Sequence, residues 1–571
     1  MHRTRGLQDI PDHILYGREI RDVKLAASRE FLMKDGIFRC SSSFAGNLRR
    51  YHGLFIEDER IVLSSLHETI NGISLLPGWW GEQSPVSYTG YSLSAELYPV
   101  VQEFALPDLL IRRTTILDQG LIIRWEIEGK ADMQIRPLMT DRTIHELSFS
   151  PSGTAYRYPD GLKLNGYPTY CTLPFTPDFQ IYYNACYPGE EKLDYMARED
   201  LASPGFFSGK VRDETIILRF EPKGDKMEKV PDLINEHDLL KRASELCLEN
   251  DNILTGYPWN TKIHNRDTFI SLPGLLLAYN RYSEAEDIFR GYLDRYINRK
   301  EDFIPGSNTD FSSDTPLWFF WAFFQYLQTH QNSPFVDEVI PQIEALITTY
   351  PDRDAVELNM DLISVPPNST WMNSTLTPRE GKPVEVNALW ILALEVCKYL
   401  EIETEVTPEK ARDAFTAFWN EKKGYAYDVL DPNDPSLRPN QVIALAFGLL
   451  RFDEGRKALE IIREKLLTPF GLRSLARGEP GYIGRSIRDP SYHNGMVWPW
   501  LTGWYIDAMI QYGEPVSCAS RVILPAWHHF FTDGAGMLPE LFDGDPPHNP
   551  AGSICHACSI AEMIRARNRA I

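Results

Sequence analysis

The sequence predicts two folded parts, an N-terminal antiparallel β-sandwich followed by a C-terminal barrel of paired helices, the (α/α)6 barrel. Three observations support this fold class. The chain has 571 residues, which is longer than one hydrophobic core supports. Its hydrophobic pattern has a period of two up to about residue 225, and a helical period begins near residue 234. We therefore expect one domain over residues 1–228 and a second over residues 229–571.

The N-terminal part contains runs in which apolar and polar residues alternate. Examples are "LLIRRTTILD" (109–118), "LIIRWEIEG" (121–129) and "ETIILRFEP" (214–222), and Gly, Pro or Asp bounds each run. Such alternation is typical of strands with one buried face. These runs predict the antiparallel, sandwich-like domain.

The C-terminal part contains twelve candidate helices. They are expected to begin near Leu233, Asp267, Ser283, Thr315, Ser333, Val384, Thr407, Asn440, Asp453, Gly495, Pro515 and Ser553. Ser283 with Glu286 matches a capping box, and Ser333 and Thr407 each precede a proline at the first helical position. Twelve helices in this order predict six hairpins that close into a barrel. An α-solenoid is the alternative, but the sequence has no fixed-period repeat.

The charge of the chain excludes some classes of partner. The net charge is −21 and no run of Lys or Arg is present, which argues against binding to nucleic acid or to an anionic membrane. The start, "MHRTRGLQDIPDHILYG", lacks the apolar core of a signal peptide, and the apolar run "PLWFFWAFFQYL" is too short to span a bilayer. We expect a cytoplasmic protein.

The eight cysteines are too sparse for a disulfide framework, and only Cys555 and Cys558 form a CxxC pair. Because no second pair completes a zinc site, we expect both to be buried core cysteines of a helix rather than redox or metal residues.

Five long segments between the helices are rich in Trp, Arg, Asp, Asn and His. They are residues 252–266, 301–314, 359–383, 477–494 and 532–552. Loops of this length inside a compact domain are usually functional. Where the first segment ends and a helix opens, Arg266 and Asp267 suit a polar clamp for two sugar hydroxyls, or equally an ordinary charge pair at a helix N-terminus.

Two later loops carry further candidate residues. The stretch "RDPSYHNGMVWPWLTGWY" (488–505) is rich in residues that stack on sugar rings or bind hydroxyls, although an aromatic core stripe has the same pattern. The loop "GMLPELFDGDPPHNPAGS" (536–553) presents Glu540. An inverting glycosidase needs one carboxyl group to protonate the leaving oxygen and a second, about 6.5–9.5 Å away, to activate water. Glu540 suits the second role.

Seven blocks of sequence, taken together, resemble one known family in content and order. The blocks are "NLRRYHGLF" (47–55), "GYPWNTKIHNRDTFISLPGLLLA" (256–278), "DTPLWFF" (314–320), "TWMNSTLTPREGKPVEVNALW" (370–390), "LRPNQVIAL" (437–445), "GYIGR" with "SYHNGMVWPWL" (481–501) and "LPELFDGDPPHNPAGS" (538–553). They resemble the glycogen debranching enzymes of the prokaryotic type, which carry the amylo-α-1,6-glucosidase domain of the larger eukaryotic enzymes. The resemblance covers nearly the whole chain.

This resemblance implies a β-sandwich followed by an (α/α)6 barrel. It also implies release of glucose from the α-1,6-linked stubs of glycogen or a limit dextrin, with inversion and without a metal or organic cofactor. It places the general base at Glu540 and the clamp on the non-reducing end at Arg266 and Asp267. The same blocks supply the remaining expected substrate-binding residues, which are Trp259, Asp314, Trp318, Trp371, Arg379, Glu385, His493 and Trp498.

The chain departs from the family in a shorter loop between Asn373 and Thr377, in His264-Asn265 where a tryptophan is expected, and at one position that bears directly on catalysis. The family reads Trp-Met-Asp where this chain has Asn373, and that aspartate is the expected general acid. An amide has no proton to donate at neutral pH. Three interpretations follow: a relative that kept the site and lost fast hydrolysis, an engineered Asp-to-Asn change, or another carboxyl group that donates the proton. The candidates for that group are Asp267, Glu380 and Glu385.

The function expected from the sequence is therefore that of an exo-α-1,6-glucosidase impaired at Asn373. A glucan-binding protein with little turnover is the alternative from another class. A glycosidase or phosphorylase of the same barrel class with a different substrate is the third. A phosphorylase needs basic or hydroxyl groups for phosphate, and no such cluster is visible in the sequence near Glu540.

Overall fold

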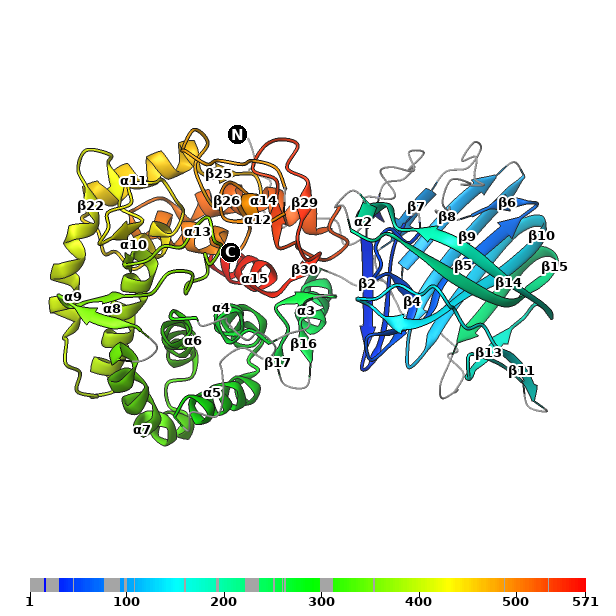
Figure 1. Ribbon diagram of the computed structural model, residues 1–571, viewed down its shortest axis with the longest axis horizontal. Helices are drawn as coiled ribbons and strands as arrows, with labels where there is room; N and C mark the ends of the chain where they lie inside the picture. The colour runs from blue at the N-terminus through cyan, green and yellow to red at the C-terminus, as the bar shows by residue number, and fades with distance from the viewer. Residues whose placement is uncertain are drawn as a thin grey trace. The chain divides into compact units, whose positions relative to one another are not determined.

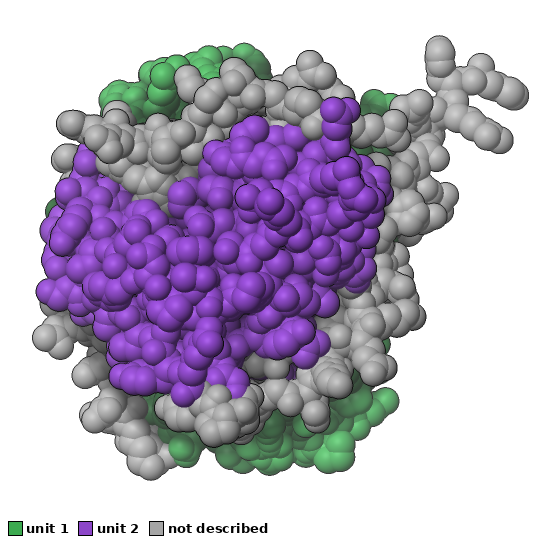
Figure 2. All heavy atoms as spheres, turned by 90° about the vertical axis from the view of Figure 1, so that its right-hand side faces the viewer, with its two compact units in different colours: residues 1–10, 240–530, 537–571 green, residues 11–239, 531–536 purple. Residues whose placement is uncertain are grey.

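The chain divides into two compact units in a computed structural model (Figure 2). A helical unit comprises Met1–Ile10, Leu240–Phe530 and Met537–Ile571, and a β unit comprises Pro11–Leu239 and Phe531–Gly536. The structure describes residues 15–16, 30–44, 46–75, 93–96, 100–106, 108–158, 161–191, 195–220, 236–249, 252–258, 260, 263–297, 312–352, 355–486, 488–531 and 533–570.

The β unit is built on one antiparallel sheet, in which the described residues form fifteen strands. The central strands β9, β10 and β15 cover the three alternating runs that the sequence predicted, and β10 pairs with β9, β5 and β15. The strands are β1 (Leu15–Tyr16), β2 (Glu30–Asp35), β3 (Phe38–Ser43), β4 (Gly53–Glu57), β5 (Arg60–Ile70), β6 (Ile73–Ser74), β7 (Leu93–Glu96), β8 (Val100–Leu106), β9 (Leu109–Leu117), β10 (Leu121–Thr143), β11 (Ala155–Tyr158), β12 (Gly161–Leu164), β13 (Tyr167–Cys171), β14 (Phe175–Cys186) and β15 (Arg198–Phe220). A short helix, α2 (Pro188–Glu191), follows β14.

The helical unit contains a counterpart for each of the twelve predicted helices. These are α3 (Glu236–Leu246), α4 (Asn265–Leu275), α5 (Tyr282–Ile297), α6 (Thr315–His330), α7 (Pro334–Thr349), α8 (Val384–Tyr399), α9 (Pro408–Phe415), α10 (Gln441–Ala446), α11 (Phe452–Lys465), α13 (Leu501–Gln511), α14 (Val516–Phe531) and α15 (Ala557–Ala570). The short α12 (Arg488–Tyr492) was not predicted.

Six of these helices pack in a closed ring. In order around the ring, α4 packs on α6, α6 on α8, α8 on α10, α10 on α13, α13 on α15, and α15 on α4 (Figure 1). The ring helix α6 is apolar on nearly all sides and almost wholly buried, as expected for a helix with neighbours all round. Gly274 of α4 permits close packing on α15, because a Cβ there would lie 2.1 Å from the carbonyl oxygen of Ala561.

Short strands connect the helices at the loops; ten form pairs, and β25 to β29 form one five-stranded sheet among the described residues. They are β16 (Leu248–Glu249), β17 (Asn252–Ile253), β18 (Gly256–Tyr257), β19 (Glu357–Asn359), β20 (Leu362–Ser364), β21 (Lys382–Pro383), β22 (Trp419–Asn420), β23 (Tyr425–Ala426), β24 (Val429–Leu430), β25 (Leu467–Thr468), β26 (Gly471–Arg473), β27 (Val497–Trp498), β28 (Leu541–Phe542), β29 (Pro550–Ala551) and β30 (Cys555–His556). Two predicted helix starts are wrong because of them. The helix expected near Gly495 begins at Leu501, because strand β27 precedes it. The helix expected near Ser553 begins at Ala557, because strand β30 precedes it.

Two of the three predicted helix caps are confirmed. The hydroxyl of Ser333 accepts from the backbone N–H of Phe335, and Thr407 accepts from Lys410. The capping box at Ser283 is wrong, because α5 already begins at Tyr282. Glu286 instead accepts hydrogen bonds from the hydroxyl groups of Tyr326 and Ser333, which fastens α5 to the next hairpin.

The cysteine prediction holds in part. Cys558 is a buried residue of α15, as expected, but Cys555 lies in strand β30. The eight cysteines, all of which lie in the described part of the chain, form no disulfide bond with one another. Within the described residues, no group of three or more His, Cys, Asp or Glu side chains is arranged to hold a metal ion. No described helix is long and apolar enough to cross a membrane.

Candidate active site

The polar residues of the helical unit gather where the ring helices begin. Asp267 lies in the first turn of α4, Asp314 is the N-cap of α6, Glu385 lies in the first turn of α8 and Asn440 is the N-cap of α10. Contacts between these starts and the preceding loops show that they meet at one end of the ring. Strand β27 precedes α13 and the loop with Glu540 precedes α15, so all six ring helices contribute.

The first cluster joins the starts of α4 and α6. The guanidinium group of Arg266 lies 3.4 Å from Oδ1 of Asp267 and 3.7 Å from Oδ1 of Asp314. Burial raises the pKa of Asp267, but the positive charge of Arg266 and the imidazoles of His264 and His556 outweigh this effect, so that the pKa lies below its ordinary value. Asp267 is therefore a carboxylate at neutral pH.

Asp314 connects this cluster to the loop that carries Trp371. Its Oδ2 accepts from the indole N–H of Trp318 at 3.3 Å and from the backbone N–H of Trp371 at 3.0 Å. The indole N–H of Trp371 donates to Oδ1 of Asn440 at 2.9 Å. Both the backbone and the side chain of Trp371 are thus fixed by ring-helix starts.

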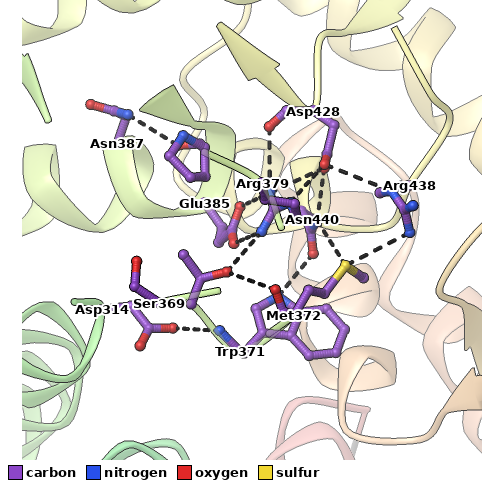
Figure 3. Close-up of polar contacts among 12 residues, drawn as sticks. Asp314, Ser369, Trp371, Met372, Arg379, Glu385, Asn387, Asp428, Arg438 and Asn440 are labelled. Carbon is purple, nitrogen blue, oxygen red and sulfur yellow. Dashed lines mark hydrogen bonds and ion pairs between the residues drawn. The ribbon is translucent and has the colours of Figure 1, made fainter. Parts of the chain in front are cut away.

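A buried charge network holds the same loop from its other side (Figure 3). Arg379 donates to both carboxylate oxygens of Glu385, to Oδ2 of Asp428 at 2.7 Å and to Oγ1 of Thr370 at 3.2 Å. Asp428 in turn accepts from the side-chain amide of Asn440 at 2.7 Å. The side chains of Arg379, Glu385 and Asp428 are at most 2% exposed. Burial raises the pKa of Glu385, although Arg379 opposes this rise.

Aromatic rings pack beside Trp371. The imidazole of His493 stacks on Trp498 with centroids 5.4 Å apart, and Trp371 meets both rings edge-on at 5.5 and 5.1 Å. His493 is 1% exposed, and neither of its ring nitrogens has a hydrogen-bond partner among the described residues. Burial, together with the charges of Arg438, Arg266 and Arg379, holds the pKa of His493 well below 6.5.

Glu540 completes the cluster. Its Oε1 accepts from the phenol of Tyr492, and its Oε2 accepts from the backbone N–H of Ser553 at 3.0 Å. The ring of Tyr492 packs against His493 and Trp498. Burial and the carboxylates of Glu540 and Asp267 hold the pKa of Tyr492 well above 10, so its hydroxyl remains a donor at neutral pH.

The structure brings together most of the residues that the sequence singled out. Those joined in one network of contacts are Asp267, Arg266, Asp314, Trp318, Trp371, Arg379, Glu385, His493, Trp498 and Glu540. Asn373 follows this network on the Trp371 loop, with an exposed side chain. Trp259 lies outside the described residues.

Sequence reasoning missed the residues that connect the parts of the network. Asp428 lies in none of the seven blocks, and nothing nearby in the sequence marks it as the partner of Arg379. Arg438 and Asn440 stood in a quoted block without a role. In the structure Arg438 donates to the backbone oxygen of His493 at 2.6 Å. A polar residue directly before an apolar helix, as at Asn440, is the signal that was available.

Comparisons with known proteins agree with this arrangement. A family model described as amylo-alpha-1,6-glucosidase matches residues 234–565, and one described as glycogen debranching enzyme N terminal matches residues 29–217. Among solved structures, the chain resembles a bacterial glucoamylase complexed with acarbose, with a TM-score of 0.55 and 12% identity over 100% of this chain and 96% of the other. That likeness shows a shared fold. The family match covers more than half of the chain, so this protein belongs to the amylo-α-1,6-glucosidase family of glycoside hydrolases and carries the N-terminal region of glycogen debranching enzymes.

Proposed function

We propose that the chain is an exo-α-1,6-glucosidase that releases glucose from the branch stubs of glycogen or a limit dextrin with inversion, at a rate reduced by Asn373. The observation that carries the proposal is the carboxylate of Glu540, which two donors orient; one of them, Tyr492, also feels the charges of Asp267 and Arg266. The bacterial glucoamylase of similar fold holds acarbose, which supports an α-glucan as the substrate class.

In this proposal Glu540 is the general base. Tyr492 and Ser553 each occupy one of its oxygens, which fixes the plane of the carboxylate and leaves lone pairs to accept a proton from water. Arg266 and Asp267 offer a donor and an acceptor to neighbouring sugar hydroxyls. The edge-on packing of Trp371 against His493 and Trp498 gives the site a rigid aromatic wall.

The protonation of the leaving oxygen is the weak step. Asn373 has no proton to donate. Asp267 is held as a carboxylate by Arg266, and Glu385 is fully buried in its pair with Arg379, so neither is a ready donor. These contacts support slow hydrolysis over rescue by Asp267 or Glu385. A general acid typically contributes about 10²–10⁴-fold to the rate.

The closed ring of six helices supports an (α/α)6 barrel for the helical unit. In this fold the six ring helices form the inner layer, and helices such as α5 and α7, which pack on each other, form the outer one. The long loops then gather at the end of the barrel where the ring helices begin. We retain the β-sandwich over residues 1–228 and the barrel over 229–571 as part of the proposal.

A second function, a glucan-binding protein with little turnover, is favoured by one observation. Asn373 replaces the expected acid while the contacts that hold its loop, from Trp371 to Asn440 and from Arg379 to Asp428, are all present. Such a site keeps its shape and lacks only the group that would donate a proton to the leaving oxygen.

Glucose release from a phosphorylase limit dextrin tests both functions. The rate of glucose release is compared among the chain as written, Asn373→Asp and Glu540→Gln. The anomeric form of the first glucose released is also determined. Three results together support the glucosidase function. The chain as written releases glucose slowly, Asn373→Asp releases it about 10²-fold faster or more, and the first product is β-glucose. If glucan binds to all three variants and none of them releases glucose, the binding function replaces it.

A further inference from the structure

We propose that Asn373 is a site of spontaneous deamidation, and that the aspartate formed there supplies the carboxylic acid that the site lacks. This inference rests on the proposed function, because it takes position 373 as the place of the general acid. It adds a chemical route by which the chain gains activity without a change in its gene.

The local sequence and structure suit this reaction. Asn373 is followed by Ser374, whose small side chain leaves the backbone nitrogen accessible. The side chain of Asn373 is exposed, and the hydrogen bonds found among the described residues include none from its amide or from the N–H of Ser374. Both reacting groups are therefore free of competing partners.

The reaction balances with water alone. The backbone nitrogen of Ser374 attacks Cγ of Asn373, a new N–Cγ bond forms, and the side-chain nitrogen leaves as ammonia. Water then opens the resulting succinimide. Attack at Cγ breaks the new bond and gives aspartate, whereas attack at the backbone carbonyl gives isoaspartate. One water is consumed and one ammonia is released.

The loop is anchored so that the product stays in place. Upstream, Trp371 is held by Asp314 and Asn440. Downstream, the backbone N–H of Thr377 donates to the oxygen of Ser374 at 2.8 Å, and their hydroxyl groups are hydrogen-bonded to each other. A carboxyl group formed at position 373 therefore lies two residues from the aromatic wall.

Three other asparagines before a small residue are protected, although Asn71 before Gly72 and Asn184 before Ala185 are exposed. Asn494 is buried and its oxygen accepts from Arg438. The side-chain oxygen of Asn165 accepts from a backbone N–H. Asn332 is followed by Ser333, whose backbone N–H donates to a carbonyl oxygen and is therefore hindered from attacking the Asn332 side chain. Asn368, which precedes Ser369 in the same loop, is also exposed and provides an internal reference for the reaction.

Conversion of a small fraction of the molecules to aspartate at position 373 is sufficient to change the measured rate of glucose release. A general acid contributes about 10²–10⁴-fold, so conversion of about one molecule in a hundred is enough to double the glucose release of the slow chain. The activity of a preparation is then expected to increase with its age. The increase is expected to follow the aspartate fraction at position 373.

The experiment follows the full chain during incubation in mildly alkaline buffer. At intervals, peptide mass mapping measures aspartate and isoaspartate at positions 373 and 368, and glucose release from limit dextrin is measured on the same samples. Three variants accompany it. Ser374→Val hinders the attacking nitrogen, Asn373→Gln requires a slower six-membered ring, and Asn373→Asp gives the end point.

We expect aspartate to appear at position 373, glucose release to rise in proportion, and Ser374→Val to slow both. An active Asn373→Asp variant with no conversion at position 373, or with isoaspartate as its only product and constant activity, overturns the inference and leaves the proposed function standing. An Asn373→Asp variant without activity overturns the assignment of the acid and with it the proposed function.

Discussion

Tyr492 donates its phenolic hydrogen to Glu540 across 48 residues of sequence, and the backbone N–H of Ser553 occupies the other carboxylate oxygen. Because burial and nearby carboxylates hold the pKa of Tyr492 well above 10, this donor stays protonated wherever the protein is folded at ordinary pH. The orientation of the proposed base thus depends on one side chain and one backbone group.

We predict that Tyr492→Phe reduces kcat without loss of fold. A hydrogen bond to a charged group is worth about 1.5–3 kcal/mol, which corresponds to about 10–10²-fold in rate. The measurement is kcat for glucose release in the Asn373→Asp background. Tyr425→Phe is the matched control, because it removes a phenolic hydrogen bond to the carbonyl oxygen of Pro435. Equal kcat in the two variants would contradict a role for Tyr492.

Gly552 sets the position of the same carboxylate. Its φ is +71°, and a Cβ there would lie 2.4 Å from Oε2 of Glu540. We predict that Gly552→Ala displaces Glu540 and lowers kcat by about 10²-fold, the typical effect of misplacement by about 1 Å. Gly481→Ala is the control, since Gly481 has φ +84° and open space around it. Both variants should lose about 1–2 kcal/mol of free energy of unfolding, and a control with the same loss of kcat would refute the steric argument.

The fold was predictable where the signals are local. The ring helix α6 is a long apolar run, and the caps at Ser333 and Thr407 lie within three residues of the groups they bind. Strand β27 could not be predicted, because two residues form a strand only through partners far along the chain. Val497 pairs with Arg473 on one side and with Phe542 on the other.

In the site, too, local motifs could be recognised in the sequence, whereas partners far along the chain could not. Motifs identified Arg379 and Glu385 as important, but the five residues between them do not reveal that Asp428 lies on the other side of the guanidinium group. Likewise the sequence placed His493 among sugar-binding residues. The structure buries it against Trp498, and its contact with sugar stays a prediction.

The Arg379 network predicts a large effect on stability. Arg379→Met leaves Glu385 and Asp428 buried without their common partner, and breaking a buried pair in this way costs about 3–5 kcal/mol. Urea unfolding of the full chain at neutral pH measures the loss. Arg412→Met is the control, because the Arg412–Glu395 pair is more than one third exposed and is worth about 0–1 kcal/mol. Similar losses in the two variants would show that the network adds no more than a surface pair.

The buried imidazole of His493 predicts a dependence of stability on pH. The unfolded chain binds a proton at His493 near pH 6.5, but the folded chain does so only at a much lower pH. As the pH falls below 6.5, the unfolded state therefore binds a proton at His493 that the folded state does not bind. The free energy of unfolding decreases by up to about 1.4 kcal/mol per pH unit from this residue until the folded pKa is reached.

His493→Phe should remove this dependence. Phenylalanine keeps an aromatic ring against Trp498 and eliminates two buried nitrogens that lack partners among the described residues. Urea unfolding followed by tryptophan fluorescence, from pH above 6.5 down to mildly acidic pH, compares the two chains. We expect a constant difference above pH 6.5, and below it an increasing advantage of the variant of about 1.4 kcal/mol per pH unit. Parallel curves across the whole range would mean that His493 takes up its proton in the folded chain as readily as in the unfolded one.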